Sequence, residues 1–258
     1  MKVASWNVNS LNVRLPHVLR WLETAEPDVL GLQETKLPDD RFPAEAFTEA
    51  GYHVVYAGQK TYNGVALIAR RPLSDVVFDP PGLDDPDRRV VAATVDGLRV
   101  INLYVVNGRS VDDPKYQFKL EWLNRIHDWL AVERQQNAEM VVMGDFNIAP
   151  ADGDVHDPDR WRDSILCSPP ERERLKSLLD LGLVDAYRRF DQPSGVFSWY
   201  DYRTRGFQRG LGLRIDLTLV SEALEPRLTA AGIDLEPRGW ERPSDHAPVW
   251  VQWSDRLA

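Results

Sequence analysis

The most informative segment of the chain reads Met140-Val141-Val142-Met143-Gly144-Asp145-Phe146-Asn147. Its first four residues are apolar, which is typical of a short buried strand. The strand reaches a glycine, beyond which a carboxylate and an amide two residues apart point to the same side. The carboxylate can orient or deprotonate water, and the amide can donate to a phosphoryl oxygen. The alternative interpretation is an Asx turn that only closes the strand.

Four further polar motifs lie along the chain, and most of them also follow an apolar run. They are Trp6-Asn7-Val8-Asn9, Gln33-Glu34-Thr35-Lys36, Arg214-Ile215-Asp216 and Ser244-Asp245-His246. The runs before the first three are residues 2–5, 29–32 and 211–213, and the run before the last is less clear. Ligands and catalytic groups gather at strand ends and in loops held by rigid elements. Acids, amides and one histidine together are what a magnesium-assisted phosphoryl displacement requires.

The composition restricts the class of protein. A chain of 258 residues can form one large domain or two small ones. With 31 basic and 40 acidic residues the net charge is −9, so any nucleic-acid contact must come from a local basic patch. The single cysteine, Cys167, excludes an internal disulfide and fits a reducing compartment. No targeting segment or membrane-length apolar run is visible, so we expect a cytoplasmic protein.

Strand and helix signals alternate along the chain. Helical spacing of apolar residues predicts helices over 14–25, 116–130 and 171–181. Strands are predicted over residues 53–56, 65–69, 76–78, 90–95, 98–106, 213–220 and 247–253, with an Asp96-Gly97 hairpin turn. Hairpins between βα units indicate mixed sheets. Because the polar motifs come from both ends of the chain, we expect one domain over residues 1–258, with two sheets face to face and helices outside.

Several single residues fit a phosphoryl-transfer site, and each also has an ordinary structural interpretation. Glu34 follows a predicted strand, so it offers a hard oxygen ligand at a sheet edge, and Asn7 emerges from the first strand similarly. Asp216 is the natural candidate to fix the tautomer of His246. Tyr104 ends a strand of aliphatic residues and can either pack in the core or reach a phosphate. For Glu34 and Asn7, the alternative is a turn former.

Residues 198–210 interleave aromatic residues, arginines and glycines. Positive charge beside a stacking surface is what a nucleic-acid contact loop needs. The aromatic candidates are Trp199 and Phe207, and the basic candidates are Arg203, Arg205 and Arg209. A solvated hairpin with a partly packed tryptophan is the alternative, but a local run of positive charge in an acidic chain favours contact with DNA.

Taken together, these motifs resemble the exonuclease III family of abasic-site endonucleases, within the endonuclease/exonuclease/phosphatase superfamily. The match runs in the family's order through Trp6–Leu11, Leu32–Lys36, Gly144–Pro150, Phe197–Arg203, Gly212–Asp216 and Ser244–Pro248, and so covers essentially the whole chain. The resemblance implies a four-layered α/β sandwich of two mixed sheets. It also implies a Mg²⁺-dependent hydrolase, with Mn²⁺ as a substitute, that acts as a monomer on double-stranded DNA.

The resemblance also implies roles for individual residues. The metal would be held by Glu34 with Asn7, next to Asp145 and Asn147, and Asp245 would be a further ligand. Asp145 would position or deprotonate the attacking water, and Asn147 would steady it. His246, oriented by Asp216, would bind the scissile phosphate, and Tyr104 would hydrogen-bond it. On the DNA side, the implied contacts are Asn107 with the backbone, Trp199 as the wall of a pocket for a base-less sugar, and Phe207 and Leu213 as weaker candidates.

The implied activity is incision of duplex DNA 5′ to abasic sites, trimming of 3′ ends, or both. Two departures from the family pattern affect this choice. Val105-Val106 replaces a proline-containing pair after Tyr104, and the loop after Gly108 is short. A phosphatase or phospholipid-type phosphodiesterase with the same core residues is the second interpretation. A binding module that has lost catalysis is the third.

Overall fold

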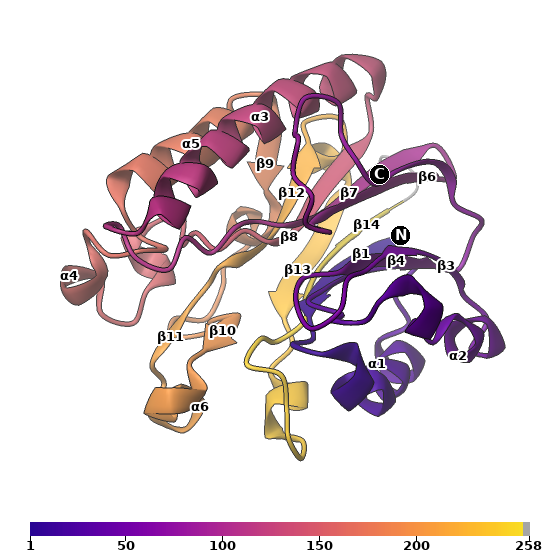
Figure 1. The fold of residues 1–258 in the computed structure, drawn as a ribbon, viewed down its shortest axis with the longest axis horizontal. Coiled ribbons are helices and arrows are strands. Elements are labelled where there is room, and N and C mark those ends of the chain that lie inside the picture. Colours follow the sequence, from indigo (N-terminus) through magenta and orange to yellow (C-terminus); the bar gives the residue numbers. More distant parts are fainter. Residues whose placement is uncertain (255–258) are drawn as a thin grey trace.

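The computed structural model describes residues 1–254 and contains two six-stranded mixed sheets that face each other (Figure 1). The first sheet has the order β13 (Leu228–Ile233), β14 (Val249–Trp253), β1 (Lys2–Asn7), β2 (Val29–Gln33), β4 (Val65–Ala69) and β3 (His53–Ala57). The second has the order β5 (Ser74–Val77), β6 (Val90–Val95), β7 (Leu98–Tyr104), β8 (Met140–Asp145), β12 (Asp216–Ser221) and β9 (Leu183–Asp185).

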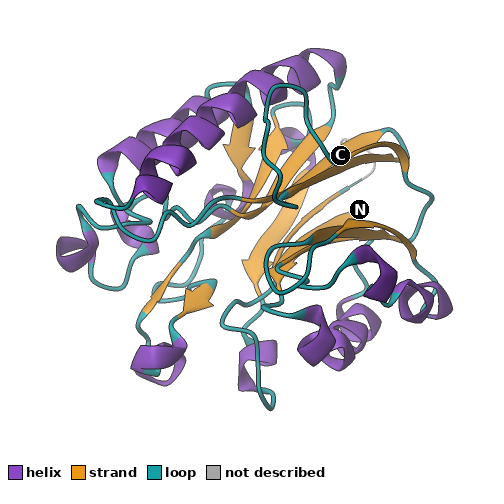
Figure 2. Ribbon diagram, in the orientation of Figure 1, coloured by secondary structure: helices purple, strands orange, loops and turns teal. Residues whose placement is uncertain are grey.

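Helices cover the outer face of each sheet (Figure 2). On the first sheet lie α1 (Leu11–Ala25) and α2 (Ala44–Glu49), and on the second lie α3 (Pro114–Gln136) and α5 (Pro169–Leu179). A short hairpin of β10 (Trp199–Tyr200) and β11 (Gly212–Leu213) projects at one end with α6 (Gly206–Arg209), and α4 (Pro158–Trp161) lies nearby. Short 3₁₀ turns lie at residues 39–41, 152–154, 186–189, 202–204, 225–227 and 236–239. This arrangement confirms the predicted four-layered sandwich.

Three apolar clusters fill the spaces between the four layers. The central cluster joins the two sheets through side chains such as Val3, Val29, Val100, Val141 and Val251. A second cluster packs Trp122 and Leu175 of the helices onto the outer face of the second sheet. A third packs Trp21 and Phe47 onto the first sheet. Burial on both faces explains why the central strands read as continuous apolar runs instead of alternating ones.

The polar motifs meet because their strands begin or end at the same edge of the sandwich. In the first sheet β1 and β2 are parallel, with Asn7 opposite Gln33. In the second sheet Asp145 at the end of β8 lies opposite both Tyr104 of parallel β7 and Asp216 of antiparallel β12. Ligand-binding groups in open α/β sheets collect at such strand ends.

Several predicted boundaries differ from the structure. β8 continues through Gly144 to Asp145 instead of stopping before the glycine. β7 ends at Tyr104 and does not extend to Val106, although the amide of Val105 still donates to the carbonyl of Asp145 on the parallel strand. The expected strand over 213–220 is divided at Arg214 and Ile215 into β11 and β12. In the described structure no strand ends directly before Ser244: β13 ends at Ile233 and a 3₁₀ turn over residues 236–239 follows, so the motif lies just ahead of β14.

Among residues 1–254, no helix is long and apolar enough to cross a membrane.

Candidate active site

Two carboxylates from opposite sheets are held together by one amide group. The Nδ2 of Asn7 donates to the Oε1 of Glu34 and to the Oδ2 of Asp145, at 2.9 Å in both cases. Asn7 is fully buried, and its own Oδ1 accepts from the amide of Asn9 at 3.0 Å. The amide thus fixes the distance between an acid of the first sheet and an acid of the second.

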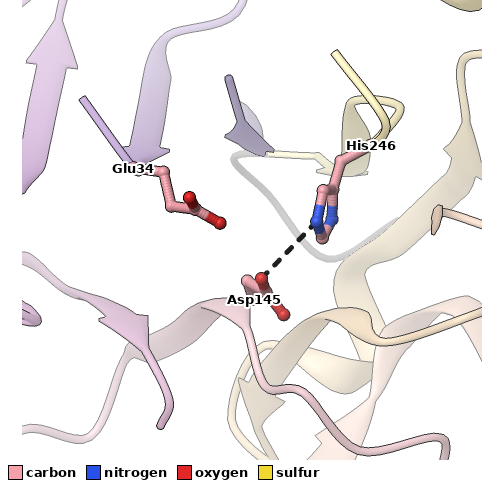
Figure 3. Close-up of side chains that lie close together, drawn as sticks. All are labelled: Glu34, Asp145 and His246. Atoms are coloured by element: carbon pink, nitrogen blue, oxygen red, sulfur yellow. Dashed lines mark ion pairs between the residues drawn. The ribbon is translucent and has the colours of Figure 1, made fainter. Parts of the chain in front are cut away.

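Glu34, Asp145 and His246 face one another across this space (Figure 3). One potential ligand atom from each lies within 4.8 Å of the others, and no other such group of three occurs in the described part of the chain. The imidazole Nε2 of His246 lies 3.7 Å from the Oδ2 of Asp145. Side chains from residues 34, 145 and 246 therefore form one polar centre.

Several residues around this centre have an unusual backbone conformation. Glu34 and Asn147 both have left-handed φ values, 51° and 49°, and Lys36 is similar at 56°. Such conformations cost about 1–3 kcal/mol each and persist where the surroundings fix them, which is common at functional sites. Gly144 is required for a different reason: a Cβ there would lie 1.9 Å from the carbonyl oxygen of Leu103, so only glycine allows β8 to approach β7.

His246 is oriented by a buried carboxylate. Its Nδ1 lies 2.8 Å from the Oδ2 of Asp216, and both side chains are buried. Burial alone would lower the pKa of His246, but the negative charges of Asp216 and Asp145 outweigh this effect and raise it. The Oγ of Ser198 accepts from the backbone amides of Ile215 and Asp216, which holds the carboxylate in place. The imidazole therefore presents its Nε2 to the centre and favours the protonated form.

Asp145 is the most deeply placed acid of the centre. Its Oδ1 accepts from the amide of Asn147 at 2.9 Å, while its Oδ2 faces Asn7 and His246. Burial raises the pKa of Asp145, the nearby charge of His246 lowers it, and the carboxylates of Asp216 and Glu34 raise it further. A carboxyl with a raised pKa, held beside a cation-binding acid and an imidazole, is suited to accept a proton from water.

Tyr104 lies beside both acids. Burial raises the pKa of its hydroxyl, and the charges of Glu34 and Asp145 raise it further. The guanidinium of Arg89 lies 5.1 Å from the centre of its ring. The phenol therefore stays protonated and can donate a hydrogen bond. The sequence left two interpretations of Tyr104 open, core packing and contact with a phosphate, and the structure places it beside the acids.

Asn107 and Asn147 form a hydrogen-bonded pair at the rim. The Nδ2 of Asn107 donates to the Oδ1 of Asn147 at 3.0 Å, and the Nδ2 of Asn147 donates to the carbonyl of Val105 at 2.9 Å. Asn107 is exposed, whereas Asn147 is buried. These contacts, together with the burial of Val105 and Val106, hold the loop in place although it lacks the proline expected from the family pattern.

Asp245 and Trp199 are joined to each other. The Nε1 of Trp199 donates to the Oδ2 of Asp245 at 3.1 Å, and the Nδ2 of Asn9 donates to its Oδ1 at 3.0 Å. Asp245 is not part of the group formed by Glu34, Asp145 and His246. Trp199 is half-buried, so part of its ring is open, whereas Leu213 is fully buried in a packing cluster and offers no surface for a pocket.

The arginine-rich segment lies on the projecting hairpin and α6. Arg203, Arg205 and Arg209 are all exposed. Phe207 instead packs against Tyr200, with ring centres 5.2 Å apart, and against the guanidinium of Arg238 at 4.9 Å. The three arginines are therefore available to a polyanion, while Phe207 is partly committed to the hairpin.

Lys36 contacts the centre, although no role was expected for it from the sequence. Its Nζ lies 3.0 Å from the Oε2 of Glu34 and donates to the Oδ1 of Asn9 at 2.6 Å. The only sequence signal was its position within the Gln33-Glu34-Thr35-Lys36 motif, which does not say that the lysine turns back toward Glu34. Its left-handed backbone makes this turn.

The donor set of the centre fits a hard divalent cation. Carboxylate oxygens of Glu34 and Asp145 converge on one space, which suits the preference of Mg²⁺ for one or two carboxylates plus water and substrate oxygens. The Nδ1 of His246 is engaged by Asp216, and its pKa is raised, so the imidazole suits an anion better than a metal.

Comparisons of the sequence with known proteins find one family of phosphate-ester hydrolases. Residues 4–246 match the model of the Endonuclease/Exonuclease/phosphatase family. The sequence is 38% identical over 267 residues to exodeoxyribonuclease III of Haemophilus influenzae, covering 98% of this chain and 100% of that protein.

Solved structures give a similar result. The fold superposes on a Neisseria 3′ phosphatase bound to product DNA hairpin with a TM-score of 0.97 and 50% identity, over 98% of this chain and 99% of that one. It superposes on an AP endonuclease from Archaeoglobus fulgidus with a TM-score of 0.95 and 38% identity, over 98% of this chain and 99% of that one.

Proposed function

This chain belongs to the endonuclease/exonuclease/phosphatase family, and we propose that it hydrolyses phosphate esters of damaged DNA with the help of Mg²⁺. The relatives named above indicate a DNA-cleaving hydrolase. The observation that carries the proposal is the convergence of Glu34, Asp145 and His246 within 4.8 Å, with Asp216 behind the imidazole. An acid, a cation-binding acid and a positively charged imidazole are the groups that hydrolysis of a phosphodiester needs.

The residues divide the chemistry between them. Asp145 orients the attacking water and accepts its proton. His246, kept protonated by Asp216, faces the negative phosphate, and the hydroxyl of Tyr104 donates to the same group. Asn147 steadies the water and the phosphoryl oxygens, and Asn107 contacts the adjacent DNA backbone.

Mg²⁺ would be held by Glu34 and Asp145, with Asn7, Asn147 and Asp245 as the other candidate ligands, and Mn²⁺ would substitute. Bound there, the cation would neutralise charge on the phosphate and polarise it. Asn7 contributes in a second way, because its amide sets the spacing of the two carboxylates.

We further propose that 3′ ends are the preferred substrate and abasic sites the second. The structure at 50% identity is named a 3′ phosphatase, whereas the AP endonuclease is 38% identical. Trp199 would line the pocket for the 3′-terminal or base-less sugar, helped at its edge by Phe207, and Arg203, Arg205 and Arg209 would hold the duplex.

The test compares three duplexes of one sequence: one with a recessed 3′-phosphate, one with a single abasic analogue and one undamaged with a recessed 3′-hydroxyl. Rates are measured with Mg²⁺, with Mn²⁺ and with EDTA. Fastest release of phosphate from the first duplex, abolished by EDTA, is expected. Cleavage of none of the three, with hydrolysis of a phospholipid or small phosphate ester instead, would favour the superfamily phosphatase alternative.

We also infer that residues 1–258 act as a single domain and as a monomer in the cytoplasm. Contribution of both ends of the chain to one centre supports the first part, and the lone buried Cys167 supports a reducing compartment. Light scattering of the purified protein, with and without DNA, tests the monomer.

A further inference from the structure

A buried ammonium group lies directly behind the loops that carry Asn107 and Asn147. The Nζ of Lys119, on α3, donates to the backbone carbonyl of Asn147 at 2.7 Å and to that of Asn107 at 3.2 Å. The side chain of Lys119 has no exposed surface, and its third partner is the carboxylate of Glu171 on α5, which is also fully buried.

Burying the charges of Lys119 and Glu171 is unfavourable, so the hydrogen-bond partners of the two groups indicate what the pair does. Removing two charges from water is strongly unfavourable, and only good geometry with every donor and acceptor satisfied compensates for it. Here Glu171 also accepts from the amides of Leu166 and Ser168 and from the Oγ of Ser168. The three donors of Lys119 therefore have three acceptors, and two of these are backbone carbonyls of residues at the rim of the active site.

The two carbonyls belong to Asn107 and Asn147, and the position of each side chain depends on the conformation of its backbone. Asn147 has a left-handed backbone, at φ 49°, and its amide donates to Asp145. Its side chain is held between Asn107 and the carbonyl of Val105. A Cβ on the adjacent Gly108 would lie 3.3 Å from the Cδ of Lys119, so the loop rests on the lysine stem.

We propose that Lys119 is a positioning residue: its ammonium fixes the loops after β7 and β8 relative to each other, and thereby places Asn107, Asn147 and Asp145 for reaction. It touches neither substrate nor the reacting atoms. This role rests on the proposed function, since it concerns the same centre.

A second buried ion pair on α3 provides a matched control. Arg99 of β7 pairs with Glu133 near the other end of α3, at 2.7 Å, and the two side chains are 5% and 12% exposed. It joins the same helix to the same sheet but contacts no residue of the centre. Replacing each pair by uncharged side chains of similar size gives K119M/E171Q and R99M/E133Q, and neither leaves an unpaired buried charge.

The experiment measures kcat and KM on the best DNA substrate, per folded molecule, together with melting temperature. For K119M/E171Q we expect kcat to fall on the order of 10²-fold with KM little changed, because a small displacement of catalytic groups has this effect. R99M/E133Q should have a lower melting temperature than wild type but the same kcat. Wild-type kcat in K119M/E171Q, or equal kcat losses in both variants, overturns the proposal.

Two additional measurements keep the outcome clear. E171Q alone keeps the Lys119 amine, which has N–H donors for both carbonyl acceptors whether or not it is protonated, so it should keep kcat even where it lowers stability. Loss of kcat in E171Q contradicts the proposal, including in the case that K119M/E171Q does not fold. Hydrogen exchange of peptides covering residues 105–109 and 145–149 should quicken in K119M/E171Q and not in R99M/E133Q. If wild type cleaves no DNA but this exchange difference is present, the proposed function fails while the positioning role stands.

Discussion

The Nδ1 of His246 lies 2.8 Å from the Oδ2 of Asp216, and both side chains are buried. The second oxygen of Asp216 has no hydrogen-bond partner in the described structure, so the carboxylate acts mainly on the imidazole. Its negative charge raises the pKa of His246 against the opposing effect of burial. This pair therefore determines both the direction and the charge of the imidazole that faces Asp145.

Replacing Asp216 by Asn should lower the pKa of His246, because the largest source of stabilising negative charge is removed. We expect turnover to fall on the order of 10²-fold or more, and the alkaline limb of the pH–rate profile to move to lower pH. The profile should be measured from pH 6 to 10. D180N, which changes an exposed carboxylate paired with Lys176, should leave the profile in place. An unshifted alkaline limb in D216N would mean that His246 does not act as a cation.

The same pair predicts how stability varies with pH. His246 has a folded-state pKa above its unfolded value of about 6.5, so its contribution is fully present below that pH. It is lost as the pH rises through the raised folded value. The melting-temperature difference between wild type and D216N should therefore be largest near pH 6 and should narrow at alkaline pH. A difference that grows with pH would contradict the raised pKa.

Glu34→Gln should lose most metal-dependent cleavage while keeping the fold, because it removes charge without changing size. It also removes the charge from the acceptor of Asn7 and abolishes the ion pair with Lys36. Mg²⁺ should raise the melting temperature of wild type, as any ligand of the folded state does, and should raise that of E34Q less. E26Q changes an exposed glutamate and is the control. Wild-type cleavage by E34Q across a Mg²⁺ titration would exclude Glu34 as a ligand.

Asp145→Asn should cost on the order of 10²–10⁴ in turnover if Asp145 accepts the proton of water or orients it. DNA affinity should survive or increase, since one negative charge near the phosphate is gone. Binding is measured with EDTA present and turnover with Mg²⁺, so the two effects separate. Loss of DNA binding with intact chemistry would reverse the assignment.

The sequence was sufficient to predict the family, the two mixed sheets and the strand ends that carry the acids. Apolar runs and the following polar residues are local features, and the motifs report them directly. The family prediction is confirmed by the match over residues 4–246. The division of the 213–220 strand at Arg214 was not predictable in the same way, because the arginine is withdrawn from the sheet by buried contacts with Asp154 and Asp185.

Contacts between distant elements were beyond the reach of the motifs. Nothing in the sequence around Lys119 shows that its ammonium reaches carbonyls 12 and 28 positions away. Similarly, the bridge that Asn7 forms between Glu34 and Asp145 depends on how the two sheets pack. Such contacts are set by packing between layers, and periodicity within a segment carries no information about them.

Single Arg→Ala replacements at Arg203, Arg205 and Arg209 should weaken DNA binding, since all three are exposed on the projecting segment of an acidic protein. For each one the slope of log affinity against log salt should become shallower by about 1. Arg162 is exposed and paired with Asp159. Its replacement by Ala removes the same charge outside this segment and therefore serves as the control. Unchanged slopes in all three variants would mean that the segment is only a solvated hairpin.

Trp199→Ala should reduce the affinity for abasic-analogue DNA by about 1–3 kcal/mol, the cost of losing a stacking or packing partner. Its half-buried ring lies beside the buried Leu213, and its Nε1 is tied to Asp245. An abasic sugar is small and costs less than a paired base to extrude, so an aromatic wall can select it by shape. Binding to an undamaged duplex should change little, because phosphate contacts dominate there.

The hydrogen bond to Asp245 calls for a second variant in this experiment. W199F keeps an aromatic ring but lacks the indole N–H, so it separates the wall from the positioning of Asp245. If the ring selects the sugar, W199F should retain most of the preference for abasic-analogue DNA that W199A loses. Paired affinities for both duplexes in one buffer decide the matter. Equal losses on damaged and undamaged DNA would show that Trp199 is a packing residue, and the pocket would then have to be formed by other side chains.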